Sequence, residues 1–141
     1  MSQPALFVVG TTHHRAPLEV REKQIQRSEH LLRKVWRDNF EAQFLRALPG
    51  AQILGHNHPR LWNTVSALMP EGDRKSQWVI RLDKAGFAVS TGSACTTGKE
   101  EPSHVLSAMG YKSAQAHRAV RMSAGWETNE ADWESLLKAI L

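Results

Sequence analysis

Hydrophobic positions in the first half of the chain predict one long helix followed by two strands. From residue 24 to 48, apolar residues recur at intervals that place them on one helical stripe, and Pro49-Gly50 ends the pattern. Residues 51–54 predict a short strand, and the apolar, partly β-branched run 61–69 predicts a buried one. The predicted stripe consists of Ile25, Leu32, Val35, Trp36, Phe40 and Phe44.

The second half predicts alternating helices and strands. Residues 70–72 open a helix that Gly86 ends, and residues 87–89 form a short strand. Residues 102–109 fit a two-turn helix, and residues 117–123 alternate apolar and polar side chains as a half-buried strand does. Thr128 is the predicted N-cap of a last helix with Glu130 and Asp132 in its first turn. The apolar faces of the first and last of these helices are Trp78, Val79, Leu82 and Ala85, and Trp133, Leu136, Leu137 and Ile140.

The order of these elements predicts an α/β domain in which helices pack on a small sheet. A chain of 141 residues is long enough for one such core. The first 23 residues differ from the rest, because residues 5–9 form a short strand-forming run and Pro17 opens a separate helical turn.

Charge and composition exclude several classes of function. The net charge is +4, but basic and acidic residues alternate, whereas nucleic-acid binders concentrate their positive charge. No run approaches the ~18 apolar residues of a membrane span, and the amino terminus lacks the pattern of a secretory signal. We therefore expect a cytoplasmic protein that binds neither nucleic acid nor membrane. One cysteine excludes an internal disulfide, and His56 with His58 is too small a set to predict a metal site.

The five tryptophans are many for this length. One interpretation makes them large anchors of the core, and the other makes some of them contacts to a partner. The sequence favours the first interpretation and leaves the second open. The residues are Trp36, Trp62, Trp78, Trp126 and Trp133.

The segment with the most suggestive chemistry surrounds the single cysteine, Cys95. A lone cysteine is commonly a small buried hydrophobe. Here residues 90–98 are small and polar, which is typical of a loop that exposes a thiol. A reactive thiol also needs a lowered pKa, for which Lys99 and the helix start near Pro102 are the candidates.

Residues 90–110, STGSACTTGKEEPSHVLSAMG, are similar to the signature around the active cysteine of cysteine desulfurases that have a long cysteine loop. Four other segments agree in order along the chain. Residues 60–64, RLWNT, resemble that family's RLPNT, and residues 121–125, RMSAG, resemble part of its IRxSxG strand. Leu82-Asp83 with Gly86 resembles LDxxGI, and residues 48–50 resemble the start of its small domain. The resemblance is collinear from about residue 24 to 141.

This resemblance implies the small carboxy-terminal domain of a fold-type I transferase that depends on pyridoxal phosphate (PLP), of aminotransferase class V. It implies that Cys95 accepts sulfur as a persulfide and that Arg121 binds the carboxylate of the substrate, a task that suits the guanidinium fork. The alternative for Arg121 is a surface residue at a strand end. His104, in the PSHVL stretch, is expected to be structural.

In that family a preceding large domain supplies the lysine that binds PLP, the group stacked on its ring and the acid at its pyridine nitrogen. Nothing in the chain resembles the lysine motif. We therefore expect no PLP site in this chain and no self-sufficient desulfurase activity.

Residues 8–22, VVGTTHHRAPLEVRE, resemble the opening strand and helix of glutamyl-tRNA reductase. That enzyme's catalytic motif is not in this chain, so neither reductase activity nor tRNA binding is carried over, and His13-His14 are interpreted as loop residues. The division that follows is a 1–23 segment joined to a 24–141 desulfurase-like small domain.

Three functions remain open. The chain is a folded remnant or binding module without catalysis, a persulfide carrier that takes sulfur from a complete desulfurase, or one subunit of a split desulfurase. A small domain without its large domain also exposes apolar surface, which predicts self-association through the first strand or the long helix.

Overall fold

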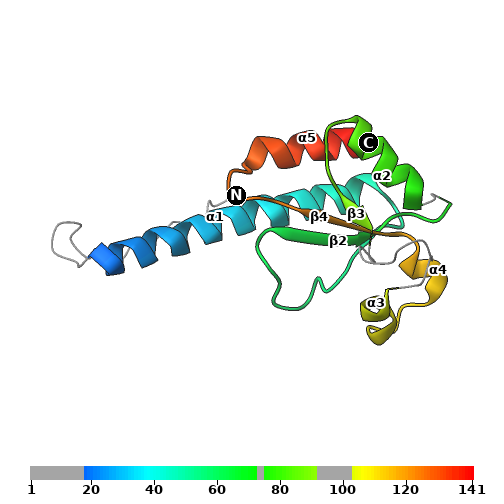
Figure 1. Ribbon diagram of the computed structural model, residues 1–141, viewed down its shortest axis with the longest axis horizontal. Coiled ribbons are helices and arrows are strands. Elements are labelled where there is room, and N and C mark those ends of the chain that lie inside the picture. Colours follow the sequence, from blue (N-terminus) through cyan, green and yellow to red (C-terminus); the bar gives the residue numbers. More distant parts are fainter. Residues whose placement is uncertain (1–17, 73–74, 92–102) are drawn as a thin grey trace.

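The computed structural model describes residues 18–72, 75–91 and 103–141, which fold as helices around one antiparallel sheet (Figure 1). The predicted strand at 5–9, His13-His14 and Cys95 lie outside the described residues. In order, the elements are α1 (Leu18–Ala47), β1 (Gln52–Ile53), β2 (Thr64–Leu68), α2 (Lys75–Lys84), β3 (Ser90–Thr91), α3 (His104–Ala108), α4 (Ser113–Ala116), β4 (Ala119–Ser123) and α5 (Glu130–Ile140).

The sheet has the strand order β1-β2-β4-β3, so the two longest strands form its centre. Strand β2 pairs with β4 over five residues, from Thr64 opposite Ser123 to Leu68 opposite Ala119. Because side chains alternate along a strand, the two faces differ in character. Val65, Ala67, Val120 and Met122 are buried toward the helices, whereas Thr64, Ser66, Arg121 and Ser123 are half-buried or exposed.

The main core lies between the sheet and helices α1, α2 and α5. Phe40 and Phe44 from α1 and the predicted face of α5 all enter this core, which confirms the expectation for the face of α5 and for these two residues of α1. A smaller cluster joins Leu68 and Ala119 to helices α3 and α4 at one end of the opposite face. The rest of that face is polar, and it is the part of the sheet that the core leaves available for a site.

Helix α1 is longer than predicted and is buried along only part of its stripe. It begins at Leu18 and passes residues 23–24 without a break, so the predicted separate turn is part of the same helix. Leu32 and Val35 were expected in the core, but about half of each side chain is exposed. The reason is visible in Figure 1, where the first half of α1 extends beyond the sheet that buries its second half.

The predicted strand at 87–89 is wrong in position, because β3 comprises Ser90–Thr91. The Phe87 amide donates to the Leu82 carbonyl and Gly86 has φ +87°, which together close the end of α2. This is a Schellman-type helix end. It engages the Phe87 amide, which would have to donate to a neighbouring strand if residues 87–89 belonged to the sheet. Ala85, expected on the buried face of this helix, is exposed.

Two features near the carboxy terminus also differ from expectation. Asn129, and not Thr128, caps α5: its Oδ1 accepts from the amides of Ala131 and Asp132, while Asp132 accepts from the Asn129 amide. The Thr128 hydroxyl instead accepts from the Gly125 amide at 3.0 Å. The short helix α4 was not predicted, because its four residues are too few for a hydrophobic period.

In the described ranges, no helix combines the length and apolar character that a membrane crossing requires.

Replacing Phe44 by alanine tests the core. Its side chain is fully buried, so the loss of transfer energy and the cavity left behind should lower the free energy of unfolding by about 3–5 kcal/mol. Denaturant unfolding measures the change, and Leu31→Ala, at a half-exposed position on the same helix, should cost less than about 0.5 kcal/mol. Equal losses in the two variants would contradict this burial pattern.

Candidate functional site

The candidate site lies on the polar face of the sheet, around Arg121. This residue is at the centre of β4, with Ser66 of β2 as its pairing partner on one side and Ser90 of β3 on the other. Its side chain is exposed, and no hydrogen bond or ion pair holds it to the described residues. Arg121 therefore lies in the middle of a strand and not at its end, and its charge has no partner among the described residues.

A cavity of about 440 Å³ opens beside Arg121. Its polar lining includes Ser66, Ser103, His58 and Arg60, and an apolar wall comes from Leu54, Val105, Leu106 and Met109. The volume is in the range of small-molecule sites, and the mixture of one apolar wall with a few polar groups is typical of them. The cavity can hold a small organic anion with Arg121 as the charged contact.

One wall of this cavity is fixed by a buried ion pair between Arg60 and Glu41. The Arg60 guanidinium donates two parallel hydrogen bonds to the Glu41 carboxylate, at 2.6 and 2.8 Å. The hydrogen bonds to Glu41 raise the pKa of Arg60 above its ordinary value, so the guanidinium stays charged. Glu41 is only 1% exposed, and its partner Arg60 thereby anchors the loop 55–60 to α1. The Arg60 Nε is buried without an acceptor.

Arg37 extends this network along α1. It donates to the Leu61 carbonyl and to Asp38, and Lys34 binds the other Asp38 oxygen at 2.5 Å. Burial acts to raise the pKa of Asp38, but the hydrogen bonds from Lys34 and Arg37 outweigh it and hold that pKa below its usual value. The helical members are spaced i,i+4, as in Lys34–Asp38 and Arg37–Glu41, which is a pattern that a sequence can show. The sequence offered no signal for the contact with Arg60, because that residue belongs to a loop distant along the chain.

The tryptophans occupy two environments within the chain, and contact of some of them with a partner stays a prediction. Trp78 and Trp133 are buried core anchors, as favoured. The other three surround Arg33, whose guanidinium lies 4.6 Å from the Trp126 ring centroid, 5.5 Å from Trp62 and 5.8 Å from Trp36. Arg33 also donates to the Thr128 carbonyl at 2.9 Å. This cluster joins α1 to the loops before β2 and after β4, and its distances are those of cation–π contacts.

The histidines considered from sequence contribute little to the site. His104 is exposed at the first position of α3, and His56 lies 3.6 Å from Glu41 Oε2. His58 lines the cavity beside Arg121. Within the part of the chain that the structure describes, no three histidine, cysteine or acidic side chains are grouped to hold a metal.

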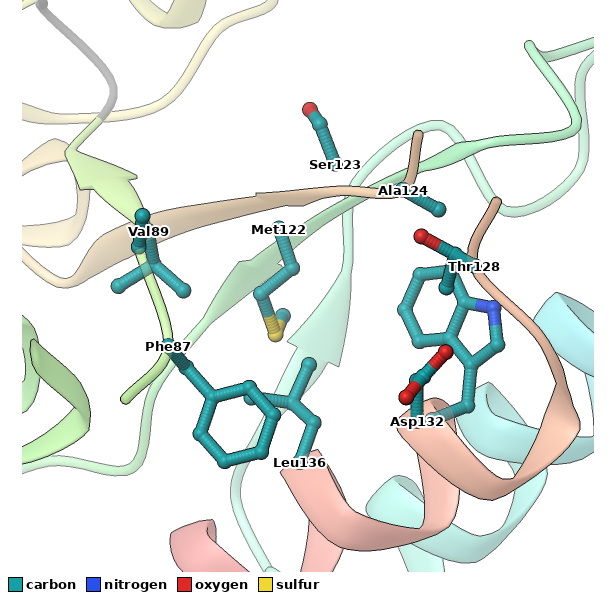
Figure 2. Close-up of a pocket in the computed structure, with 10 residues that line it drawn as sticks. Phe87, Val89, Met122, Ser123, Ala124, Thr128, Asp132 and Leu136 are labelled. Atoms are coloured by element: carbon teal, nitrogen blue, oxygen red, sulfur yellow. The ribbon is translucent and has the colours of Figure 1, made fainter. Parts of the chain in front are cut away.

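A second, smaller cavity lies where β4 meets α5 (Figure 2). Figure 2 shows Met122 directed from β4 toward Leu136 while Ser123 points to the opposite side of the strand. The cavity measures about 60 Å³, which is room for about two water molecules at ~30 Å³ each. It is too small for a metabolite. A further cavity of about 470 Å³ is lined by charged residues of α1 that are already paired, among them Lys34, Asp38 and Glu41. The cavity beside Arg121 is therefore the candidate site.

Solved structures with the same fold are known. Among solved structures, the NifS-like protein from Rickettsia africae superposes with a TM-score of 0.66 at 26% identity, covering 79% of this chain and 28% of that one. The domain therefore has the α/β small-domain fold found in NifS-like enzymes, as the sequence predicted.

Curated sequences identify the relatives more closely, although no protein-family profile matches the chain. Cysteine desulfurase from Cereibacter sphaeroides is 38% identical over 114 residues, which are 79% of this chain and 29% of that protein. Cysteine desulfurase 2 from Trichormus variabilis is 33% identical over 137 residues, 96% of this chain and 32% of that protein. The chain is homologous to the carboxy-terminal region of cysteine desulfurases and spans about a third of their length or less.

The resemblance of residues 8–22 to glutamyl-tRNA reductase receives no support from these comparisons. The match to the Trichormus variabilis enzyme covers 96% of the chain and so extends into the first 23 residues. The division at residues 23–24 stays a prediction.

The described residues do not fit the cofactor of that family. PLP needs a lysine for its aldehyde and an acid for its pyridine nitrogen. The cavity beside Arg121 has neither among its described lining. Lys34 lies in a neighbouring cavity, but it is paired with Asp38, and the Glu41 carboxylate there is held by Arg60. The chemistry that we propose for this chain does not use PLP.

Replacing Arg60 by glutamine tests the wall of the site. The change leaves the Glu41 carboxylate buried with its closest cation removed, which should lower the free energy of unfolding by about 3–5 kcal/mol. The matched control is Arg46→Gln, because Arg46 is exposed and bonds only to the Ala42 carbonyl of its own helix. Unfolding curves for the two variants that coincide would show that the Arg60–Glu41 pair does not anchor the loop.

Proposed function

We propose that this chain supplies the sulfur-accepting part of a desulfurase-like site, with Cys95 as the acceptor and Arg121 as the ligand of a carboxylate. The observation that carries the proposal is the position of Arg121. It has no hydrogen-bond or ion-pair partner among the described residues, and it lies on the polar face of the sheet opposite Ser90. The strand containing Ser90 leads directly into the segment that contains Cys95. Homology to cysteine desulfurases supports the same assignment.

The sequence distance permits the Cys95 thiol to reach a ligand of Arg121. Cys95 is five residues after Ser90, and an extended chain spans at most ~3.6 Å per residue. The Cα atoms of paired residues in an antiparallel ladder are about 5 Å apart. These lengths are sufficient for Cys95 to act on a ligand that Arg121 holds.

The proposed chemistry is thiol–persulfide exchange. The Cys95 thiolate attacks the terminal sulfur of a donor persulfide, a sulfur–sulfur bond forms on Cys95, and the donor's sulfur–sulfur bond breaks. The donor leaves as a thiolate, so one sulfur atom is transferred with no net oxidation. Arg121 contributes charge-assisted hydrogen bonds that hold a carboxylate of the donor or substrate in place.

This proposal does not include desulfuration of free cysteine by these residues alone. That reaction needs an electron sink to break a carbon–sulfur bond, and the described residues do not fit the group that supplies it. The chain then acts as a persulfide carrier or as a subunit of a split desulfurase.

A specific observation favours association with a further polypeptide. Leu31, Leu32 and Val35 are neighbouring apolar residues of α1, and each is about half exposed. Neighbouring exposed apolar side chains are typical of a surface that a partner covers. The expected self-association stays a prediction of this surface.

Selective alkylation of Cys95 tests the carboxylate site. Iodoacetate carries a carboxylate and iodoacetamide does not, although both alkylate a thiolate with loss of iodide. Arg121→Gln should lower the rate with iodoacetate relative to iodoacetamide by about tenfold, which corresponds to ~1.4 kcal/mol. Mass spectrometry gives both rates without ambiguity, because Cys95 is the sole cysteine.

The control variant for this experiment is Arg46→Gln, which removes the same charge from α1 on the helix-covered side of the sheet. It should leave the ratio of the two rates unchanged. A ratio that is the same in wild type and in Arg121→Gln would eliminate Arg121 as the carboxylate ligand.

Sulfur transfer itself is tested by incubating the chain with an active cysteine desulfurase and cysteine. Cys95 should gain the mass of one sulfur atom, removable by a dithiol, and Cys95→Ser should gain none. If the wild-type chain gains no sulfur, the carrier proposal fails, and a subunit of a split desulfurase or a non-catalytic folded remnant are the functions that remain.

A further inference from the structure

We infer that Ser66 and Ser90 are positioning residues for the ligand of Arg121, and that their hydroxyl groups add hydrogen bonds to the carboxylate that the guanidinium binds. The inference rests on the proposed function, because it takes Arg121 as the carboxylate ligand. It adds two residues that neither motif resemblance nor homology assigned.

The ladder places the three side chains in one row. Ser66 is opposite Arg121 in the β2–β4 pairing, and Ser90 is opposite Arg121 in the β3–β4 pairing. Directly opposed residues share a face of the sheet, with Cβ atoms about 4.5–5.5 Å apart. The hydroxyls therefore flank the stem of Arg121 on both sides, on the face away from the main core.

These hydroxyls are available to a ligand. Neither Ser66 nor Ser90 makes a side-chain hydrogen bond within the described ranges, although both are partly buried. Ser66 also lines the 440 Å³ cavity together with Arg121. The next row differs, since the Thr64 and Ser123 hydroxyls lie 3.5 Å from each other and form a pair of their own. In these two rows of described residues, the hydroxyls without a hydrogen-bond partner are therefore those of Ser66 and Ser90, beside Arg121.

The chemistry of this row matches a carboxylate. Two carboxylate oxygens offer about four lone-pair positions, of which the guanidinium fork occupies two. The two serine hydroxyls can donate to the others. A carboxamide of the same size offers the guanidinium one acceptor oxygen in place of two, so Arg121 disfavours it, whereas a serine hydroxyl can pair with either ligand.

The test is a titration of the protein with sodium propionate, and separately with propionamide, at constant ionic strength. The readout is the side-chain Nε–H resonance of Arg121 in the ¹⁵N-labelled chain, assigned by its loss in Arg121→Gln. Propionate should shift this resonance saturably and propionamide should not. Ser66→Ala and Ser90→Ala should each weaken propionate binding about three- to tenfold, the effect of one hydrogen bond.

Matched variants separate recognition from a loss of structure. Thr64→Ala and Ser123→Ala remove hydroxyls from the next row and should change propionate binding less than twofold. Ser66→Thr retains a hydroxyl and should bind like wild type, and the backbone amide spectrum verifies the fold of each variant.

Two outcomes would overturn the inference, and they are distinguishable. If wild-type Arg121 responds to propionate but the Ser66 and Ser90 variants bind as well as the Thr64 variant, the serines have no part in recognition and the proposed function stands. If the wild-type resonance does not respond at all, Arg121 is not a carboxylate ligand and both proposals fail.

Discussion

The pairing of β2 with β4 is the constraint on which the rest of the structure depends. Its register places Val65 opposite Met122 and Ala67 opposite Val120, so one face of the sheet is apolar and holds the three long helices. The same register puts Ser66 opposite Arg121 on the other face. A slip of one residue would exchange the two faces and bury a guanidinium in the core. The register of β2 against β4 therefore determines both the apolar face that forms the core and the polar face that carries the site.

Contacts at the ends of the two strands fix that alignment. The Ala124 amide donates to the Asn63 carbonyl at 2.7 Å, and the Asn63 side chain donates to the Ala124 carbonyl at 3.1 Å. At the other end, the Met69 amide donates to the Arg118 carbonyl. Away from the sheet, the Arg33 cluster and the Arg60–Glu41 pair hold the loop before β2 against α1. The position of Arg121 is therefore set by several independent contacts.

The sequence predicted the elements better than the site. Periodicity identified α1, α5 and the two central strands, because each buries a repeating set of apolar residues. It failed where local chemistry decided the outcome, as at Phe87, whose amide closes a helix, and at Asn129, which replaced Thr128 as the cap. Ser66 and Ser90 were not recognisable, because only the register of three strands brings them beside Arg121. Arg121 and Cys95 were predicted from family resemblance, and their roles are proposals.

The chain matches about a third of a cysteine desulfurase or less, and neither a lysine nor an acid is in the described lining of the cavity beside Arg121. A thiol acceptor and a carboxylate ligand are nevertheless sufficient for sulfur exchange, because that reaction needs no electron sink. The α1 surface of Leu31, Leu32 and Val35 is consistent with function in an assembly.

The central claim is that the Cys95 thiol operates on the polar face of the sheet beside Arg121. A nitroxide spin label attached to this sole cysteine tests it most directly, since no other residue can react. The account predicts that the oxidised label broadens the amide signals of Ser66 and Arg121 much more than those of Phe44 and Leu136 in the main core. Stronger broadening of Phe44 and Leu136 than of Ser66 and Arg121 would contradict it.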